Sequence, residues 1–318
     1  MQLAAAIEAA LGHGLGAGDR LALAVSGGPD SIALLVLAAA QLPGRFTVLT
    51  VDHGLRGGSD AEAAAVADAC AAQGIAHHIL PWQGDKPAAN LQAAARTARY
   101  ALMAEWCARN GHRLLLTAHH ADDQAETLLM RLGRGSGSGG LAGIRQQREL
   151  VPGVTLVRPL LGVRRAALAA IAAASGWPVA DDPSNRNPRF ARTAARALLA
   201  ATPWLDAARM ADAAAHLADA EAALAWAADR AWAGNVVVAA GALRIDATGL
   251  PMELQRRLVD RAIKTFATQT VLRGGDVARL AARLAAGGTG TLAGVRASGG
   301  PVWMFTRAAP RTSHRNGR

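Results

Sequence analysis

The sequence predicts an α/β fold, in which a parallel-sheet domain is followed by a smaller, mainly helical α+β domain. In the first part of the chain, short apolar or β-branched runs alternate with longer alanine-rich segments that have helical spacing. This alternation is typical of a parallel sheet covered by helices on both faces. It ends near residue 201. We therefore expect a first domain at residues 1–200 and a second domain at residues 201–318.

The strands of the first domain are expected where apolar and β-branched residues cluster, at Leu21–Val25, Thr47–Val51, His78–Leu80, Arg113–Thr117 and Val154–Val157. Helices are expected between and after them, at Ser31–Ala40, Asp60–Gln73, Asn90–Arg109, Asp122–Leu132 and Arg164–Ser175. In parallel sheets, ligands bind at the carboxyl ends of the strands, where loops lead into helices. The residues that follow each strand are therefore the candidates for a functional site.

The second domain is expected to start with a long connecting helix, Leu205–Trp232. The pattern then predicts a hairpin, further helices and closing strands, at Asn235–Ala239 with Ala242–Asp246, Pro251–Ala267, Gly275–Ala285, Thr289–Val295 and Val302–Thr306. The final segment, AAPRTSHRNGR, is expected to be disordered.

Composition narrows the classes of function. The 318 residues carry a net charge of +10, which suits a protein that binds a polyanion such as nucleic acid. No uncharged apolar run is long enough to span a membrane, and the first residues lack the basic leading segment of a secretory signal. Cys70 and Cys107 form no CxxC pair, which disfavours zinc, iron–sulfur and redox sites. We therefore expect a cytoplasmic protein without membrane contact.

The first candidate site is the segment SGGPDS, residues 26–31, between a predicted strand and a predicted helix. Gly27 and Gly28 permit a tight turn whose backbone amides approach an anion, and the helix N-terminus favours negative charge. We therefore expect nucleotide phosphates here, although the loop lacks the GxxxxGK[ST] pattern of a Walker A motif. Asp30, a carboxylate beside phosphates, implies a bridging cation such as Mg²⁺. Pro29 and Asp30 would also suit the first turn of any helix, so that interpretation stays open.

Further polar segments occupy the ends of other elements: VDHGLR (Val51–Arg56), LQAAARTARY (Leu91–Tyr100), TAHHADDQAET (Thr117–Thr127), RGSGSGGLAGI (Arg134–Ile144) and DDPSNRNPRFAR (Asp181–Arg192). Each has an alternative, purely structural interpretation. Asp123 and Glu126 have the spacing of a capping box, and Arg96 and Arg99 would lie on one solvated side of a helix.

The loop SGGPDS resembles the SGGxDS pattern of the PP-loop ATP pyrophosphatases, whose parallel-sheet nucleotide-binding domain is similar to that of the adenine nucleotide alpha hydrolases. These enzymes cleave ATP to AMP and pyrophosphate while they adenylate an oxygen of the substrate. Taken in order over about residues 20–196, all the segments are similar to those of the tRNA(Ile)-lysidine synthetase family. The resemblance implies a ligase that uses ATP and Mg²⁺ to join free L-lysine to carbon 2 of the wobble cytidine in the isoleucine tRNA with a CAU anticodon. The product, lysidine, changes decoding from AUG to AUA.

The resemblance also implies roles for individual residues. The catalytic residues are expected to be Asp30, Arg96 and Asp123, with Asp30 also placing Mg²⁺. The ATP site is expected at Ser26, Gly27, Gly28, Pro29, Asp30, Ser31, Asp52 and His53. Lysine is expected to bind Asp123, Glu126 and Asp182, whereas tRNA or phosphate is expected to contact Arg99, Arg192 and Arg196. The second domain is expected to recognise tRNA, and a homodimer is among the expected assemblies.

Some features leave other functions open. The segment TAARALLA (Thr193–Ala200) lacks an asparagine and a helix-ending proline of the family pattern, which puts the role of Arg196 in doubt. A tRNA thiolase of the same superfamily would activate the same kind of oxygen for sulfur, but it would need cysteines at the site. Cys70 and Cys107 lie instead within predicted helices. The remaining alternative is a non-catalytic RNA-binding relative, which the charged residues at the predicted site disfavour.

Overall fold

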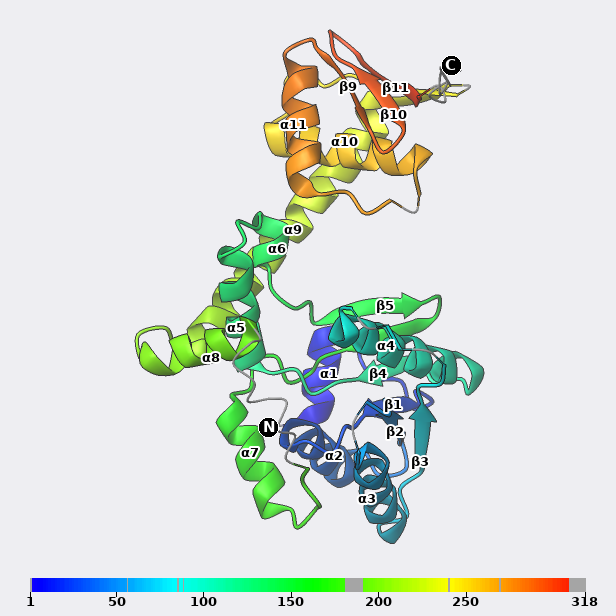
Figure 1. Ribbon diagram of the computed structural model, residues 1–318, viewed down its shortest axis with the longest axis vertical. Coiled ribbons are helices and arrows are strands. Elements are labelled where there is room, and N and C mark those ends of the chain that lie inside the picture. The colour runs from blue at the N-terminus through cyan, green and yellow to red at the C-terminus, as the bar shows by residue number, and fades with distance from the viewer. Residues whose placement is uncertain are drawn as a thin grey trace, which may run out of the picture. The chain divides into compact units, whose positions relative to one another are not determined.

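The computed structural model describes residues 2–55, 57–84, 86–87, 89–180, 191–239, 241–268 and 270–308. The chain divides into two compact units, Met1–Ala218 and Asp219–Arg318, and each is described by itself. Helix α9 (Ala207–Asn235) runs across the division (Figure 1). The boundary expected near residue 201 lies at the end of α8 (Ala191–Ala201).

The first unit contains a six-stranded sheet in the order β3-β2-β1-β4-β6-β5. Its strands are β1 (Leu21–Ala24), β2 (Phe46–Asp52), β3 (His77–Pro81), β4 (Leu114–Leu116), β5 (Gln147–Val151) and β6 (Val154–Val157). All neighbours pair in parallel except β5, which pairs antiparallel with β6 at the edge. The predicted parallel sheet is confirmed. The edge strand β5 is an element that the sequence pattern did not reveal.

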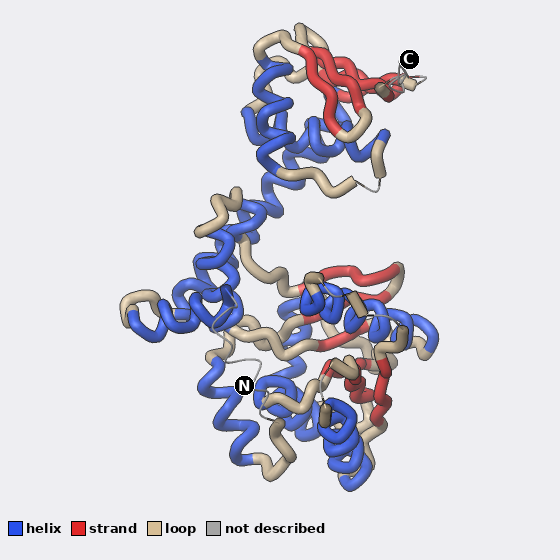
Figure 2. Tube along the Cα trace, viewed as in Figure 1, coloured by secondary structure: helices blue, strands red, loops and turns tan. Residues whose placement is uncertain are grey.

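From α1 to α5 the helices of the first unit alternate with the strands along the chain, and Figure 2 draws these helices in blue around the red strands of the sheet. The helices of this unit are α1 (Leu3–Leu11), α2 (Pro29–Gln41), α3 (Ser59–Ala72), α4 (Leu91–Arg109), α5 (Ala121–Leu132), α6 (Ser138–Leu141), α7 (Arg165–Ala174) and α8. Successive residues of β1 point to opposite faces of the sheet. Leu21 and Leu23 join a core with α1, α2 and α7, whereas Ala22 joins a second core with Met103 of α4. Apolar cores therefore cover both faces of the sheet, which explains the continuous apolar run of β1.

The strand order places a topological switch point between β1 and β4. The chain runs from β1 to β2 and β3 on one side, and then returns to form β4 on the other side of β1. In open α/β sheets, ligands bind in the crevice that such a reversal opens at the carboxyl ends of the strands. The segments that follow β1 and β4 are residues 25–31 and 117–123, which contain SGGPDS and the first part of TAHHADDQAET. The fold therefore brings these motifs to the same edge of the sheet.

The second unit contains a five-stranded antiparallel sheet in the order β7-β8-β11-β10-β9. Its elements after α9 are β7 (Val236–Ala239), β8 (Ala242–Ile245), α10 (Met252–Phe266), α11 (Gly274–Ala285), β9 (Thr289–Leu292), β10 (Val295–Ser298) and β11 (Trp303–Arg307). Alternate strand residues, among them Leu243, Trp303 and Phe305, pack against α10 and α11 in one core. The smaller α+β domain is thus confirmed.

One predicted element of the second unit is wrong. The sequence pattern predicts a single strand over Thr289–Val295, but the structure has a hairpin of β9 and β10 that turns at Ala293 and Gly294. Both turn residues have positive φ, 50° and 74°, as a two-residue turn between twisted strands requires. Alanine gives no signal for such a turn, so the sequence concealed it. Across the described part of the chain, no helix combines the length and apolar character that crossing a bilayer demands.

Candidate active site

The loop after β1 forms a tight turn that leads into the N-terminus of α2. Gly27 has φ of +85°, and Gly28 caps α2, which begins at Pro29. The Ser31 hydroxyl accepts a hydrogen bond from the Ser26 amide at 3.1 Å and donates one to the Gly28 carbonyl at 2.9 Å. A Cβ added to Gly28 would meet only the Ser26 hydroxyl, at 3.8 Å, so the space beside the loop is open. The first amides of a helix have no partner within the helix, and this loop therefore offers them to an anion.

Asp30 stands in the first turn of α2 with one oxygen engaged and one free. Its Oδ2 lies 3.4 Å from Nε2 of His120. Its Oδ1 is buried and has no hydrogen-bond partner among the described residues. The described residues also contain no group of three or more His, Cys, Asp or Glu side chains that could hold a metal ion. A Mg²⁺ ion bound through one carboxylate oxygen and phosphate oxygens would fit this arrangement.

Helix α5, which follows β4, begins with a capping box made by His120 and Asp123. The Asp123 amide donates to Nδ1 of His120 at 3.3 Å, and the His120 amide donates to Oδ2 of Asp123 at 3.2 Å. The capping interpretation therefore holds for Asp123, but its partner is His120 and not Glu126. The first turn of α5 is therefore fixed in place at the switch point.

The His120 side chain is 1% exposed and lies among carboxylates. Its Nε2 is 3.4 Å from Asp30 and 3.5 Å from Oδ2 of Asp123, and its Nδ1 is 3.8 Å from Asp122. Burial by itself would lower the pKa of His120, but the hydrogen bond to Asp30 and the charges of Asp123 and Asp122 raise it above its usual value. His120 is therefore the side chain that connects the two motifs, and the sequence analysis gave it no role.

Glu126, one turn beyond Asp123, is held by arginines of α8. Its side chain is 1% exposed, and Oε1 accepts a hydrogen bond from Nε of Arg196 at 2.5 Å. Its Oε2 lies 3.1 Å from Nε of Arg192, whose Nη1 is 3.9 Å from Asp123. Burial raises the pKa of Glu126 above its usual value, although Arg196 and Arg192 act against this. Two of the three carboxylates expected to bind lysine, Asp123 and Glu126, thus lie beside arginines of α8. The phosphate or tRNA contacts expected of Arg192 and Arg196 stay predictions.

His119 is influenced by the charges of two arginines from other elements, Arg96 and Arg158. Burial, with the charges of Arg158 and Arg96, lowers the pKa of His119 to about 3, so that its ring is neutral near pH 7. The Arg96 guanidinium lies 5.2 Å from the ring centre of Tyr100. Arg158 directly follows β6, is 5% exposed and donates to the Arg145 carbonyl at 2.6 Å. Sequence analysis missed Arg158, although an arginine immediately after a buried strand was a usable signal.

The predicted residues after β2 are engaged with their own surroundings. Oδ1 of Asp52 accepts hydrogen bonds from Ser59 at 2.7 Å and Gly54 at 2.9 Å, which lower its pKa. His53 Nε2 lies 3.3 Å from Nε of Arg99, which directs this arginine inward. Burial and the Arg99 charge lower the pKa of His53 to about 4. Nδ1 of His53 is buried without a described partner, which leaves it available to a ligand.

The glycine-rich segment after α5 is fastened to that helix. Arg131 donates to the carbonyls of Gly140 at 2.6 Å and Gly143 at 2.9 Å. Gln124 donates to the Ile144 carbonyl at 2.9 Å and accepts from its amide at 2.6 Å. The segment is therefore held by side chains of α5, and Gln124 and Arg131 are positioning residues that the sequence analysis did not identify. Asp182, the third predicted lysine ligand, lies outside the described residues.

Both cysteines are buried away from the site. Cys70 belongs to α3 and Cys107 to α4, and both are 0% exposed. Burial raises the pKa of Cys70 to about 11 and that of Cys107 to about 12. Because the thiolate is the reactive form, neither residue is a nucleophile at neutral pH. This weakens the thiolase alternative.

The chain is similar to known proteins over most of its length. Residues 2–202 match the PP-loop domain family. The tRNA(Ile)-lysidine synthase of Zymomonas mobilis is 44% identical over 296 residues, covering 92% of this chain and 89% of that protein. The tRNA(Ile)-lysidine synthase of Novosphingobium aromaticivorans is 46% identical over 300 residues, covering 93% and 91%. Among solved structures, a U34-tRNA thiolase of Methanococcus maripaludis shares the fold, with a TM-score of 0.54, 16% identity, and coverage of 68% of this chain and 78% of that chain.

Proposed function

Because the chain belongs to the tRNA(Ile)-lysidine synthase family of PP-loop enzymes, we propose how its own residues carry out lysidine formation. The reaction joins free L-lysine to carbon 2 of the wobble cytidine in the isoleucine tRNA with a CAU anticodon, and it consumes ATP. The structural observation that supports the assignment of roles is that Asp30 and Asp123 both contact His120 at the switch point between β1 and β4, with Glu126 one turn further along α5.

The loop of residues 26–31 holds the phosphates of ATP. Its free amides and the N-terminus of α2 supply positive potential without a lysine. Oδ1 of Asp30, which has no partner among the described residues, would hold a Mg²⁺ ion, and the ion would offset the repulsion between this carboxylate and the phosphates. Beside Gly27 lies a hollow of about 260 Å³, lined largely by apolar residues such as Val66 and Val179, which suits the flat adenine ring.

In the first chemical step, oxygen 2 of the cytosine attacks the α-phosphorus of ATP, and pyrophosphate leaves. Arg96 offsets the negative charge that develops on the pyrophosphate. Arg158 supports the same role, because its charge, like that of Arg96, lowers the pKa of the buried His119 ring, which stays neutral. Asp52 and His53 complete the ATP site after β2. Adenylation makes carbon 2 electrophilic, and the former oxygen 2 leaves as part of AMP only when the amine of lysine has attacked that carbon.

In the second step, the amine of lysine attacks carbon 2 and must first lose a proton, because an unperturbed lysine amine is charged near neutral pH. Asp123 and Glu126 bind the ammonium, together with Asp182. The raised pKa of Glu126 makes its carboxylate a better proton acceptor than an ordinary glutamate. For lysine to reach Glu126, Arg196 or Arg192 must yield its place, and the released guanidinium is then free for a phosphate of ATP or tRNA.

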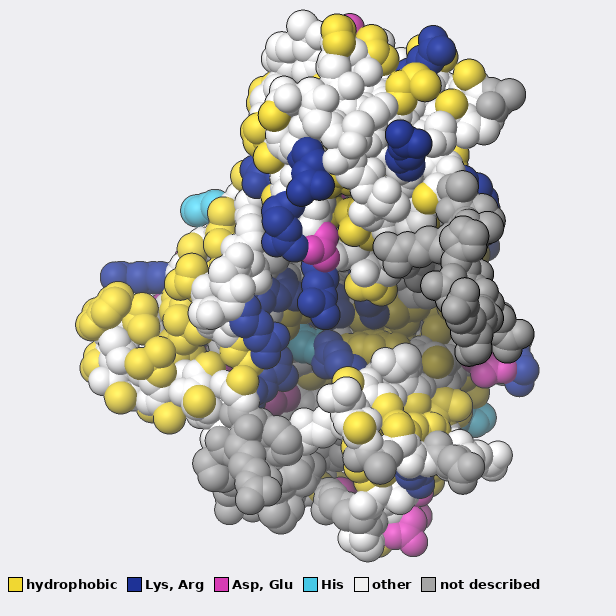
Figure 3. Space-filling model, turned by 45° about the horizontal axis from the view of Figure 1, so that its top comes forward, with side chains coloured by type: hydrophobic (Ala, Val, Ile, Leu, Met, Phe, Trp, Pro, Cys, Tyr) yellow, Lys and Arg dark blue, Asp and Glu magenta, His cyan; other side chains and the backbone are white. Residues whose placement is uncertain are grey.

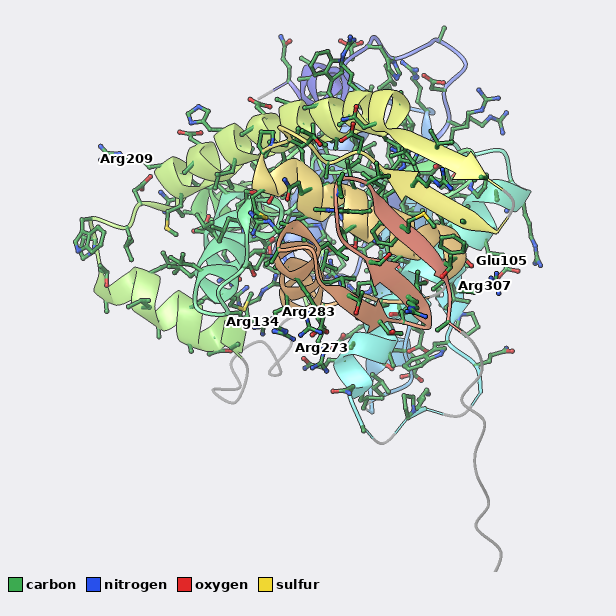
Figure 4. The ribbon with its side chains drawn as sticks, turned by 90° about the horizontal axis from the view of Figure 1, so that it is seen from above. Glu105, Arg134, Arg209, Arg273, Arg283 and Arg307 are labelled. Atoms are coloured by element: carbon green, nitrogen blue, oxygen red, sulfur yellow. The ribbon has the colours of Figure 1, made fainter. Side chains whose placement is uncertain are left out.

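The first domain, residues 1–200, is the catalytic domain in this proposal, and residues 201–318 recognise tRNA. Basic side chains outnumber acidic ones on the face drawn in Figure 3. Within the second unit, acidic residues pair with the cations of α10 and with Arg279 of α11. Several arginines have no acidic partner among the described residues, namely Arg244, Arg273, Arg283, Arg296 and Arg307. Figure 4 shows Arg273 and Arg283 along one edge of this unit and Arg307 at the end of β11.

The outer face of the antiparallel sheet supports this role. Arg244 pairs across strands with Met304, and Arg296 with Thr306, on the side opposite the core. Beside Arg244 lies a hollow of about 530 Å³, lined by residues such as Val302 and Met304. In such a place the arginine can bind an RNA phosphate, while an unstacked base packs against the apolar side chains. A homodimer and a cytoplasmic location stay predictions.

Pyrophosphate release tests the proposal. We expect release from ATP when the isoleucine transcript with the CAU anticodon is present, and lysine incorporation only when lysine is added. A thiolase would release pyrophosphate but incorporate no lysine, whereas an inactive RNA-binding relative would bind tRNA and release none. Lysine incorporation into a methionine tRNA with the same anticodon bases would contradict the proposed specificity.

A further inference from the structure

His120 contacts both halves of the proposed site, and its Nε2 lies 3.4 Å from Asp30 and 3.5 Å from Oδ2 of Asp123. Its Nδ1 accepts the Asp123 amide at 3.3 Å and so caps α5. With Nδ1 used as an acceptor, the proton of the neutral ring lies on Nε2. Nε2 faces Oδ2 of Asp30 at 3.4 Å, in a side chain that is 1% exposed. The ring therefore has one fixed orientation, which two different elements determine.

The contact with His120 decides which oxygen of Asp30 is available. Oδ2 is taken by the imidazole, whereas Oδ1 is buried and has no described partner. Asp30 belongs to the first turn of α2, and without a partner its carboxylate could turn about its side-chain bonds. Carboxylates that ligate a metal are held by a second group in this way, and such partners affect metal affinity strongly.

We propose that His120 is a positioning residue, which holds Asp30 by Oδ2 so that Oδ1 is presented to the cation of the nucleotide, while the same ring caps α5. This inference rests on the ATP and Mg²⁺ part of the proposed function. It assigns to one side chain the link between the nucleotide loop after β1 and the helix that carries Asp123 and Glu126. The link lies at the switch point, where β1 and β4 are neighbours in the sheet although β2 and β3 lie between them in the sequence.

Two substitutions separate the functions of the two nitrogens. Asparagine is a favoured N-cap and places its oxygen near the position of Nδ1, but it does not reach Asp30. Glutamine places its amide group near the position of Nε2, but it offers no acceptor where the cap requires one. His120→Asn should therefore keep the cap and lose the contact with Asp30, whereas His120→Gln should keep the contact and lose the cap.

Equilibrium binding of ATP, measured by calorimetry with and without Mg²⁺, tests the proposal without any turnover. His120→Asn should unfold at the wild-type temperature and bind Mg²⁺–ATP about tenfold more weakly, the lower end of the loss that such outer partners cause. Its affinity for ATP in EDTA should be unchanged. His120→Gln should unfold about 2–4 °C lower, as expected for a lost cap, and keep its Mg²⁺–ATP affinity.

A double-mutant cycle then shows whether His120 acts through Asp30. In the Asp30→Asn background, His120→Asn should cause no further loss of Mg²⁺–ATP affinity. A further loss of Mg²⁺–ATP affinity in the double variant, equal to the loss in His120→Asn alone, would overturn the proposal. It would also be overturned if His120→Asn and His120→Gln lost Mg²⁺–ATP affinity in proportion to their loss of unfolding temperature. These outcomes are distinct from failure of the proposed function, which would appear as wild-type protein that binds Mg²⁺–ATP normally but incorporates no lysine.

Discussion

Glu126 accepts a hydrogen bond from Arg196 at 2.5 Å, although the two residues are 70 positions apart in the chain. The Glu126 side chain is 1% exposed, so this pair ties α8 to the interior of α5. A buried carboxylate requires a cationic partner, because an unpaired buried charge is strongly destabilising. The guanidinium therefore occupies the place that the ammonium of lysine takes in the proposed reaction.

Substitution of Arg196 should make stability depend on lysine. Arg196→Gln removes the charge paired with Glu126, so we expect a lower unfolding temperature without ligand. Added lysine should raise that temperature more in the variant than in the wild type, because the ammonium replaces the lost guanidinium. Thermal unfolding over a lysine titration measures this. Arg209→Gln, at an exposed position of α9, is the control. Equal responses to lysine in all three proteins would contradict a pocket at Glu126.

Substitution of Glu126 should weaken the use of lysine more than the cleavage of ATP. Glu126→Gln removes the buried charge, and we expect the lysine concentration that gives half-maximal incorporation to rise at least about tenfold, the loss of about 1.4 kcal/mol that a charge-assisted hydrogen bond supplies. Lysine-independent release of pyrophosphate with tRNA should largely persist. If the variant only loses stability and keeps its lysine requirement, Glu126 has a structural role alone.

Substitution of Asp30 should abolish adenylation of the cytidine and leave the fold intact. Its Oδ1 has no described partner, so Asp30→Ala removes few stabilising contacts. We expect a wild-type circular dichroism spectrum and no measurable pyrophosphate release. Asp19→Ala, which removes a carboxylate that accepts the Gly16 amide before β1 and has no role in the proposed site, serves as a control with activity retained. Pyrophosphate release at near-normal rates by a folded Asp30→Ala protein would remove Asp30 from the mechanism.

Much of the fold and the site was predictable from sequence, because local patterns determine both. The apolar run of β1 followed by SGGPDS predicted the loop, and its geometry has the expected tight turn at Gly27. The pairing of Glu126 with Arg196 was not predictable, because it depends on how α8 packs against α5, far along the chain. The role of His120 was hidden for a similar reason. Nothing in the local sequence distinguishes His120 from His119. Asp30 reaches His120 only because β1 and β4 are neighbours in the sheet.

The pKa of His53 predicts a dependence of stability on pH. Burial and Arg99 lower this pKa from 6.5 to about 4 in the folded chain. A histidine whose pKa is lower in the folded state binds fewer protons there, so acid favours unfolding. The contribution of neutral His53 to the free energy of unfolding is complete above pH 6.5 and is lost as the pH falls towards about 4. Urea unfolding of wild type and His53→Gln over this range should show a smaller acid loss in the variant. If the free energy of unfolding depended on pH in the same way in wild type and His53→Gln, the prediction would be contradicted.

Arginines on the outer face of the second sheet should contribute to tRNA binding through phosphates. Arg244→Ala and Arg296→Ala should each reduce the slope of log affinity against log salt by about 1. Arg256→Ala is the matched control, because Arg256 pairs with Glu253 at 2.8 Å. Filter binding at several salt concentrations measures the slopes. Slopes that change as much in the control as in the two sheet variants would assign tRNA binding to another surface.

The most direct test of the account is mass analysis of the anticodon nucleosides of isoleucine tRNA after incubation with ATP, Mg²⁺ and isotopically labelled lysine. The account predicts that the wobble cytidine gains the mass of one labelled lysine less one water, and that Asp30→Ala prevents this gain. It also predicts that Glu126→Gln restores the gain only at high lysine concentration. An unmodified cytidine with active, folded wild-type protein, or a sulfur atom in place of lysine, would contradict it.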